Sequence, residues 1–423
     1  MTGRHPAMDA RSLCLSASAE DAARTLREWG IGPSDLVELL QSATPAAYGP
    51  GVHVVELQTN SGDRTAMVVH VPVESQGSRC GAIVLLHGAG SSGHQIAEFA
   101  AILCRSTGLY VLCPTATAAG PVSSNFELGG LFGKRVQHPR WHYGADAYPV
   151  LALKWALQHL QADPDRCVLV GHSMGAVATW NVAARYWHSW AGAAPINGAL
   201  SVWERFGPDG EAAAMLPNLV HVPVQAVHGS IDRRIPAELE AVTIEALRAR
   251  GNTNAAQVLV EGGDHPLSTM GLVPGSEHFE ALASWAVARR RNPYPRRVSH
   301  CALDLSHGRS HWIEVIELGQ PGCPTQVHAE VAQPHAIIVW ASGARRLRLH
   351  FHHRFVNPGD VQIVVNGRIL HHHFAPRLEC LIDAYRATFD TGLLSEDTLT
   401  IDILDHGKNA EEGENKWTSN TTC

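Results

Sequence analysis

The stretch that most constrains the fold is Gly171-His172-Ser173-Met174-Gly175, which follows the apolar run at residues 167–170. A serine with glycine two residues away on each side is typical of a cramped turn from a strand into a helix, because a Cβ at either glycine would crowd the backbone. Small residues after the turn let the helix, which we expect to extend to about Tyr186, lie close on a sheet. The pattern predicts a strand, a sharp turn and a helix, with the hydroxyl of Ser173 held out into a pocket.

Ser173 is the candidate nucleophile. A serine buried in a tight turn is the alternative interpretation, but the strand before it and the helix after it are the context that a nucleophile elbow requires. Ser230 is the nearest competitor, and it lies among turn residues without flanking glycines at that spacing.

Two later runs supply an acid and a base. Residues 222–227 predict a strand that leads to Asp232, and residues 257–260 predict a strand that leads to His265. The chain order serine, acid, histidine differs from the orders in the chymotrypsin and subtilisin folds. Asp232 is therefore the candidate acid and His265 the candidate base.

Other interpretations of these two residues stay open. Asp232 also fits a turn aspartate that caps a helix beginning near Pro236. Asp264 is a poorer acid, because a side chain adjacent in sequence to His265 rarely reaches its Nδ1 atom. His278 is the alternative base.

A glycine-rich turn upstream completes the constellation. Residues 82–86 predict a buried strand that runs into His87-Gly88-Ala89-Gly90. Such a turn presents backbone N–H groups, so we expect the N–H groups of Ala89 and Met174 to form an oxyanion hole.

The walls of the pocket are less defined. Residues 115–143 show no period and are rich in glycine and serine, and a loop of this length after a core strand is typical of a binding site. Trp141, His142 and Tyr143 are the candidate substrate-facing residues, with packing against the next helix as the equal alternative. His172 lines the pocket or packs beside the nucleophile, and residues 199–216 are a candidate cap.

Residues from about 80 to 290 resemble the α/β-hydrolase superfamily. Within it they are most similar to the serine esterases grouped around polyhydroxybutyrate depolymerases, feruloyl esterases and dienelactone hydrolases. Besides the elbow, the resemblance rests on Trp155, residues 163–166, Trp180 and residues 193–198. It implies an α/β fold, with a doubly wound and mostly parallel sheet, and hydrolysis of carboxylic esters without a cofactor or a bound metal.

With 423 residues the chain exceeds one ordinary core. Helical patterns occupy the N-terminus, and an antiparallel hairpin around residues 60–63 opens the sheet. The predicted division is an N-terminal helical segment at 1–50, a catalytic domain at 51–290, a linker at 291–297, a β-sandwich-like accessory domain at 298–405 and a disordered tail at 406–423.

Short β-rich runs and a turn signal at Asn366-Gly367 predict a small all-β sandwich-like domain at the C-terminus. The runs are 312–318, 327–331, 336–340, 347–353, 361–365, 368–372 and 399–404. Histidines are frequent here, and strand alternation would put His350 and His352 on one face, where a metal site is geometrically possible. Because no cysteine or carboxylate recurs at ligand spacing, we expect a solvated histidine-rich face and no metal. Three roles stay open for this domain: it binds carbohydrate, it contacts another subunit, or it narrows access to the pocket.

The composition argues against several classes of protein. The formal net charge is −7 and no long basic stripe occurs, so nucleic-acid binding is not expected. Residues 1–20 lack an apolar stretch of signal-peptide length, and no run approaches the roughly twenty apolar residues of a membrane span. Nine cysteines without a C-x-x-C pair favour reduced thiols, which predicts a cytoplasmic protein. The sequence does not predict the oligomeric state.

These observations predict a serine hydrolase that cleaves small-molecule carboxylic esters through an acyl-enzyme. A peptidase similar to the prolyl oligopeptidases has the same triad order, but no repeat of propeller-blade length precedes Cys80. A non-catalytic binding protein on the same fold is the alternative of another class. The joint presence of three triad residue types and the glycine-rich turn disfavours it.

Overall fold

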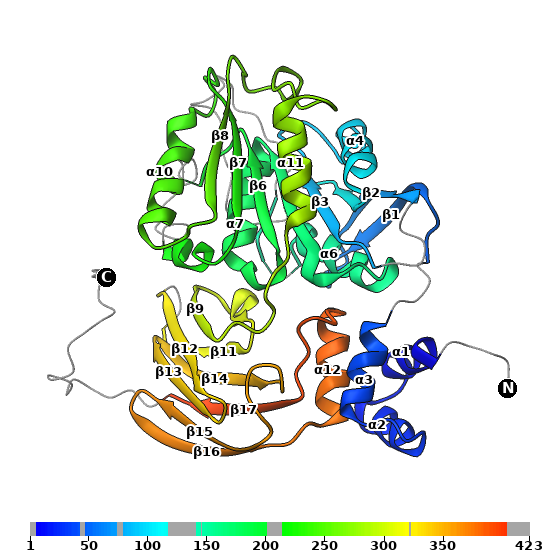
Figure 1. Cartoon of the computed structure of the whole chain (residues 1–423), viewed down its shortest axis with the longest axis vertical. Coiled ribbons are helices and arrows are strands. Elements are labelled where there is room, and N and C mark those ends of the chain that lie inside the picture. The colour runs from blue at the N-terminus through cyan, green and yellow to red at the C-terminus, as the bar shows by residue number, and fades with distance from the viewer. Residues whose placement is uncertain are drawn as a thin grey trace, which may run out of the picture.

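A computed structural model of the chain describes residues 6–42, 47–73, 79–116, 141–144, 146–200, 214–320 and 323–403. Figure 1 shows an α/β part above a β-sandwich, with a cluster of helices beside the sandwich. Most of the predicted pocket wall, most of the candidate cap and the predicted tail lie outside the described residues. No helix in the described ranges has the length and apolar character needed to cross a bilayer.

The α/β part is built on one eight-stranded sheet, which is parallel from β4 to β8 and antiparallel at the β1, β2 edge. The hairpin predicted around residues 60–63 joins β1 and β2. In spatial order the strands are β1 (Gly51–Gln58), β2 (Arg64–Val71), β4 (Tyr110–Pro114), β3 (Ala82–Leu86), β5 (Cys167–His172), β6 (Gly192–Ile196), β7 (Val224–Gly229) and β8 (Ala255–Val260).

Helices cover both faces of this sheet, which explains why its central strands are apolar throughout rather than alternating. Ile83 and Leu85 of β3 face one layer, while Val84 and Leu86 face the other. The first layer consists of α4 (Ala97–Thr107) and α11 (Glu277–Ala288). The second consists of α6 (Tyr148–His159), α7 (Met174–Arg185) and α10 (Ala237–Ala249).

The C-terminal part is a sandwich of two sheets, as the sequence predicted. Inward residues alternate with outward ones, for example along β12, and the inner faces of both sheets share one apolar core. The four-stranded sheet contains β10 (Arg309–Ser310), β11 (Ile313–Leu318), β14 (Ala344–Phe351) and β17 (Asp397–Asp402). The five-stranded sheet contains β16 (Arg368–Phe374), β15 (Gly359–Val365), β13 (Ala336–Ser342), β12 (Thr325–Gln333) and β9 (Arg297–Ala302).

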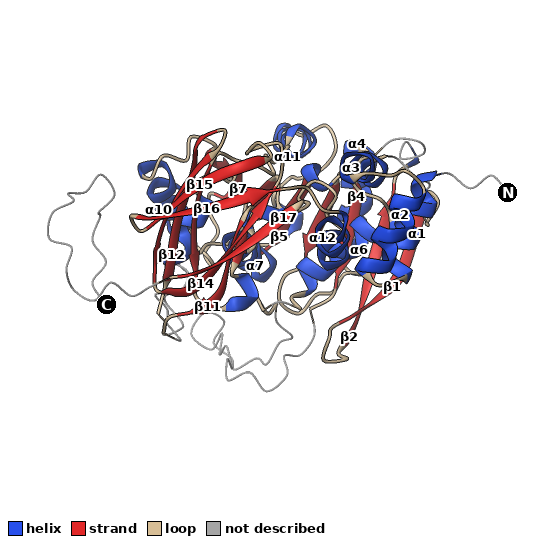
Figure 2. Cartoon of the chain, turned by 90° about the horizontal axis from the view of Figure 1, so that it is seen from below, coloured by secondary structure: helices blue, strands red, loops and turns tan. Residues whose placement is uncertain are grey.

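Four helices from the two ends of the chain pack together beside the sandwich (Figures 1 and 2). They are α1 (Pro6–Ser16), α2 (Ala19–Glu28), α3 (Pro33–Gln41) and α12 (Leu378–Thr388). The side chain of Arg386 in α12 donates to the carbonyl oxygens of Cys14 and Ala17. Helix α12 was not predicted from the sequence, although Leu378, Leu381, Ile382 and Tyr385 recur at helical spacing. The N-terminal helices therefore share their core with the C-terminal part of the chain.

The sandwich packs against the amino-terminal ends of the sheet strands. One apolar cluster joins Trp187 and Val224 of the α/β part to Val298 and Trp312 of the sandwich. Polar contacts follow the same path, because buried Asn218 donates to the carbonyl oxygen of Cys301 at 2.9 Å and accepts from its N–H at 2.7 Å.

The predicted linker, residues 291–297, contains two buried side chains, Arg291 and Tyr294, while Asn292, Arg296 and Arg297 are exposed. Arg291 is 9% exposed. Its Nε atom contacts Asp165 Oδ1 at 2.9 Å, its Nη2 atom contacts Asp390 Oδ1 at 2.6 Å, and its Nη1 atom donates to the carbonyl oxygen of His188 at 2.8 Å. This guanidinium therefore connects the α/β part to the segment that follows α12.

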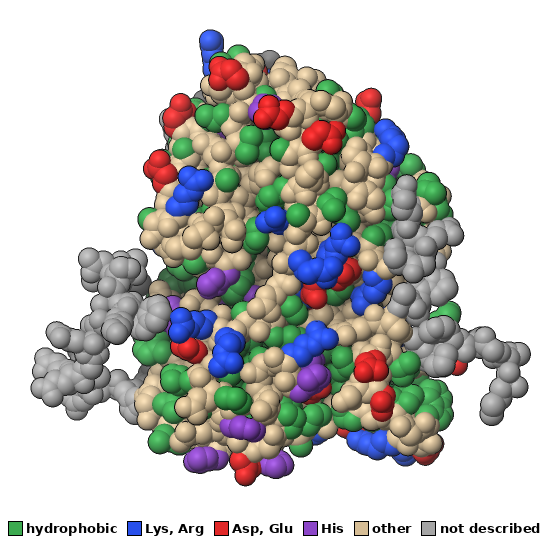
Figure 3. Space-filling model, viewed as in Figure 1, with side chains coloured by type: hydrophobic (Ala, Val, Ile, Leu, Met, Phe, Trp, Pro, Cys, Tyr) green, Lys and Arg blue, Asp and Glu red, His purple; other side chains and the backbone are tan. Residues whose placement is uncertain are grey.

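The prediction of a shared face for His350 and His352 was wrong, because β14 ends at Phe351. His350 is buried between Ser395 Oγ at 2.8 Å and Glu314 Oε2 at 2.9 Å, and the ring of buried His352 stacks on Tyr294. Histidines do gather on the sandwich end of the surface in Figure 3, and His353, His371 and His373 are exposed. The expected solvent-exposed histidines are therefore His353, His371 and His373, whereas His350 and His352 are buried.

Replacing Arg291 tests the anchoring of this segment. Arg291→Ala leaves Asp165 and Asp390 without their buried counter-ion, so we expect the free energy of unfolding to fall by about 3–5 kcal/mol. The neighbouring Arg290→Ala is the matched control, since that side chain is 63% exposed and should contribute less than about 1 kcal/mol. Urea unfolding followed by tryptophan fluorescence measures both, and equal losses for the two variants contradict the anchoring.

Candidate active site

Ser173 occupies a strained turn between β5 and α7. Its φ of 56° and ψ of −117° lie in a region that residues with a side chain rarely adopt. The two flanking glycines are needed sterically, because a Cβ at Gly171 would lie 2.2 Å from the carbonyl oxygen of Gly175, and a Cβ at Gly175 would lie 2.2 Å from that of Leu86. The Ser173 N–H donates to the carbonyl oxygen of Ile196 at 2.9 Å, which fixes the turn against β6.

A hydrogen-bonded chain joins Ser173 to the predicted base and acid. Ser173 Oγ lies 2.7 Å from His265 Nε2, and His265 Nδ1 lies 2.8 Å from Asp232 Oδ2. An ionised carboxylate only accepts hydrogen bonds, so Nδ1 carries the proton and the lone pair of Nε2 faces the serine hydroxyl. The three residues come from the carboxyl ends of β5, β7 and β8, which parallel strands bring to one edge.

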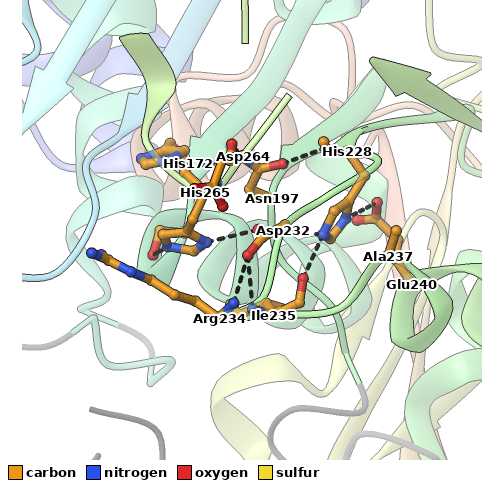
Figure 4. A network of polar contacts seen from close by, with 12 residues as sticks. His172, Asn197, His228, Asp232, Arg234, Ile235, Ala237, Glu240, Asp264 and His265 are labelled. Carbon is orange, nitrogen blue, oxygen red and sulfur yellow. Dashed lines mark hydrogen bonds and ion pairs between the residues drawn. The ribbon is translucent and has the colours of Figure 1, made fainter. Parts of the chain in front are cut away.

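Asp232 both accepts hydrogen bonds from the turn that follows it and pairs with His265, so the two roles that its sequence position allowed occur together. While Oδ2 faces His265, Oδ1 accepts the backbone N–H groups of Arg234 at 2.8 Å and Ile235 at 3.0 Å (Figure 4). Burial alone opposes ionisation of Asp232, but hydrogen bonds from His228, His265 and the Ile235 N–H outweigh it, and the pKa of Asp232 lies well below its usual value. The side chain is therefore a carboxylate held in one orientation.

The backbone of His265 is fixed by Asn197, a residue to which the sequence analysis gave no role. Buried Asn197 donates from Nδ2 to the carbonyl oxygen of His265 at 2.9 Å, and its Oδ1 accepts the N–H of Gly229 at 2.8 Å. It adopts a left-handed φ of 53° directly after β6. Asn197 thus ties the ends of β6 and β7 to the His265 loop.

His172 has a defined hydrogen-bond partner in the His265 loop. Its Nε2 atom lies 2.8 Å from the carbonyl oxygen of His265, to which it donates, and the two rings are 5.5 Å apart. Burial lowers the pKa of His172 to about 4, so the ring is neutral near neutral pH. Its contact supports the His265 loop, and any role in binding substrate stays a prediction.

The glycine-rich turn lies against the elbow. Strands β3 and β5 pair in register up to Leu86 opposite Gly171, so the turn begins where the elbow begins. A Cβ at Gly88 would lie 3.3 Å from the Cβ of Ser173. Met174 is the first residue of α7, where an N–H has no partner within the helix. This position favours the expected role of the Ala89 and Met174 N–H groups, which the structure leaves as a prediction.

His87 and Trp141 hold that turn. His87 Nε2 accepts the N–H of Ala116 at 2.9 Å, its Nδ1 donates to the carbonyl oxygen of Gly88 at 2.8 Å, and Trp141 Nε1 donates to the carbonyl oxygen of His87 at 3.2 Å. Trp141 is 4% exposed. Its described contacts are therefore those of packing.

His142 and Tyr143 also contact neighbouring helices. The His142 ring packs edge-on against Tyr148 of α6, and the carbonyl oxygen of Tyr143 accepts the hydroxyl of Tyr186 at 3.0 Å. Whether either side chain contacts substrate stays a prediction.

One group of residues has ligand types suited to a metal, namely His352, His353 and Glu396, whose ligand atoms lie within 4.8 Å of one another. Hydrogen bonds already occupy most of these atoms. His352 Nδ1 accepts the N–H of Arg354 at 3.2 Å, and Glu396 accepts both the N–H and Nδ1 of His353 at 2.7 Å. The Nδ1 contact puts the proton of neutral His352 on Nε2, which leaves no free lone pair for a cation. The bonding pattern therefore does not favour a metal site.

The strand order, the single antiparallel edge and the strand-turn-helix at Ser173 together decide the architecture. The chain has the α/β-hydrolase fold. The triad candidates lie at the carboxyl edge of its sheet, while the sandwich lies at the amino edge.

Comparison with known proteins gives low similarity. No protein-family model matches the chain, and no curated protein matches it either. Among solved structures, an S-formylglutathione hydrolase from Agrobacterium tumefaciens is 18% identical, covers 59% of this chain and 99% of its own, and has a TM-score of 0.44. A thermostable esterase is 20% identical, covers 57% of this chain and 63% of its own, and has a TM-score of 0.42. An acetyl xylan esterase from Aspergillus awamori is 17% identical, covers 56% of this chain and 98% of its own, and has a TM-score of 0.38.

Proposed function

We propose that this protein is a serine hydrolase that cleaves carboxylic esters through an acyl-enzyme on Ser173. The observation that carries the proposal is the hydrogen-bonded chain from Ser173 through His265 to Asp232, with its serine held at a strained elbow. Backbone strain of this kind costs about 1–3 kcal/mol and persists where the surrounding structure enforces it, typically at functional sites. A protein that only binds a ligand has no need of a serine held in this way.

In the acylation step, Ser173 Oγ attacks the ester carbonyl carbon while its proton passes to His265 Nε2. The negative charge that forms on the carbonyl oxygen is stabilised by the N–H groups of Ala89 and Met174. The Asp232 carboxylate stabilises the resulting imidazolium. His265 then gives its Nε2 proton to the departing alcohol oxygen, and the C–O bond breaks to leave the acyl group on Ser173.

Deacylation repeats these steps with water. His265 Nε2 takes a proton from a water molecule that attacks the acyl carbon, and the same N–H groups hold the oxyanion. Return of the proton to Ser173 Oγ releases the carboxylic acid and restores the starting state. No group outside the protein, ester and water is required for either step.

The first test removes the nucleophile. Ser173→Ala should lower hydrolysis of nitrophenyl esters by a factor of about 10⁴–10⁶, because loss of a triad member removes the acyl-enzyme route. A panel of nitrophenyl esters of increasing acyl length, with a proline-containing peptide amide alongside, separates an esterase from a peptidase. Ser230→Ala is the matched control and should keep its activity. An alanine variant at Ser173 that keeps a tenth of the activity contradicts the assignment.

A second test separates the base from the acid. His265→Ala should be nearly as damaging as the loss of Ser173, whereas Asp232→Asn should keep a measurable rate that is at least about tenfold above that of His265→Ala, with a loss of about 10⁴-fold against wild type. The amide can keep the Arg234 and Ile235 contacts while turning its NH₂ toward His265, which favours the wrong imidazole tautomer. Wild-type kcat/KM should also have an acid limb, because an Nε2 atom that already carries a proton cannot accept the serine proton. A pH profile without an acid limb excludes His265 as the base.

A further inference from the structure

A second histidine and a second carboxylate lie directly behind Asp232. His228, near the end of β7, places Nε2 at 3.6 Å from Asp232 Oδ2 and Nδ1 at 2.8 Å from Oε2 of Glu240 on α10 (Figure 4). The side chains of His228, Asp232 and Glu240 are all 0% exposed. The sequence analysis gave neither His228 nor Glu240 a role.

The hydrogen-bond pattern restricts where the protons lie. His228 Nε2 is 2.7 Å from the carbonyl oxygen of Ile235, which can only accept, so Nε2 carries a proton. The remaining contact, between Nδ1 and Glu240 Oε2, holds one further proton that belongs either to the imidazole or to the carboxyl group. The charge of His228 depends on which of the two has it.

The surroundings favour the proton on His228. Burial raises the pKa of Glu240 to about 7, while hydrogen bonds from His228, from Trp180 Nε1 to Oε1 at 3.4 Å and from Gln257 favour its carboxylate. The pKa of His228 is raised further, to about 10, so the shared proton belongs to the imidazole. The Asp232 carboxylate on the other side attracts positive charge. Burial opposes a charge on His228, but its hydrogen bonds to Asp232 and Glu240 prevail and raise its pKa.

We propose that His228 is a buried imidazolium cation that positions Asp232 for His265, with Glu240 as its counter-ion. This inference rests on the proposed function. The described contacts of His228 are with Asp232, Ile235 and Glu240, so we infer that it acts through Asp232 as a positioning residue. It supports the Ile235 carbonyl oxygen from one side of the turn, while Asp232 binds the Arg234 and Ile235 N–H groups from the other.

The positive charge has a consequence for the base. A cation behind Asp232 partly offsets the attraction of that carboxylate for positive charge, so a variant that loses the cation should show the acid limb of kcat/KM at higher pH. The other ionisable groups that face this set are His172 at the end of β5, Arg234 in the turn after β7 and Asp264 before His265.

Glu240→Gln tests the charge with little change of shape. The glutamine NH₂ can donate to Nδ1, so His228 keeps its place but becomes neutral. We expect kcat/KM near pH 9 to stay within about tenfold of wild type, and its acid limb to move about one pH unit higher, as an effective dielectric constant of about 20 suggests. A loss of rate at every pH without a shift of the acid limb indicates a merely structural role and overturns the inference.

A double variant and a control variant test whether the shift comes from the charge of His228. The double variant His228→Gln, Glu240→Gln removes both charges together and should show the same upward shift, which covers the case in which the single variant folds poorly. Glu314→Gln is the matched control, because Glu314 also pairs with a buried histidine, His350, but in the sandwich. Its acid limb should coincide with that of wild type.

An activity-independent measurement separates this inference from the proposed function. In protein labelled with ¹⁵N-histidine, both ring nitrogens of His228 should show imidazolium shifts at neutral pH, with the signals assigned by their loss in the double variant. A neutral His228 in an active esterase overturns this inference alone. A cationic His228 in a protein that hydrolyses no ester overturns the proposed function, and with it the positioning role.

Discussion

The hydrogen bond between His265 Nδ1 and Asp232 Oδ2 is the interaction on which the site depends. It selects the tautomer that turns a lone pair toward Ser173, and it requires three loops at one sheet edge to be placed within tenths of an ångström. Asn197 and His172 hold the His265 backbone, while the N–H groups after Asp232 hold the carboxylate. The described polar contacts of Asn197, His172 and the turn after Asp232 therefore hold Asp232 and His265 in the orientation that this hydrogen bond requires.

The sandwich lies at the edge of the sheet opposite to Ser173, His265 and Asp232. It shares an apolar cluster with Val224 and Ala255, the first residues of β7 and β8, whereas Asp232 and His265 follow the carboxyl ends of these strands, roughly 16 Å of strand away. Of the three roles that the sequence left open for the sandwich, narrowing of the pocket is the one that this placement does not support. The Arg291 ion pairs and the shared apolar cluster instead join the C-terminal part of the chain to the α/β part near the amino-terminal ends of the sheet strands.

The features that the sequence predicted are those encoded by local pattern. The elbow at Ser173, the strands that lead to Ser173, Asp232 and His265, and the seven C-terminal β runs each follow from apolar periodicity and turn residues within a few positions. Strand β6 (Gly192–Ile196) was not predicted. The fold class and its triad candidates could therefore be predicted without the structure. Asp232 was the least certain of them, because one carboxylate serves a turn and a histidine together.

What the sequence did not predict depends on contacts between distant segments. Arg291 between Asp165 and Asp390, and the core that α12 shares with the N-terminal helices, have no local signature. The histidines of the sandwich looked like surface residues, but several are buried at its contact with the α/β part, where burial lowers the pKa of His300 to about 4. The Glu240 contact with His228 likewise joins a helix to a strand end and becomes visible only in three dimensions.

The most direct test of the central claim is to trap the covalent intermediate. When the whole protein is mixed rapidly with nitrophenyl acetate and quenched in acid, we expect a burst of nitrophenol close to one equivalent per chain. Peptide mapping by mass spectrometry should then find one acetyl group on Ser173. An acetyl group on another residue, or hydrolysis that proceeds without any acylated protein, contradicts the account.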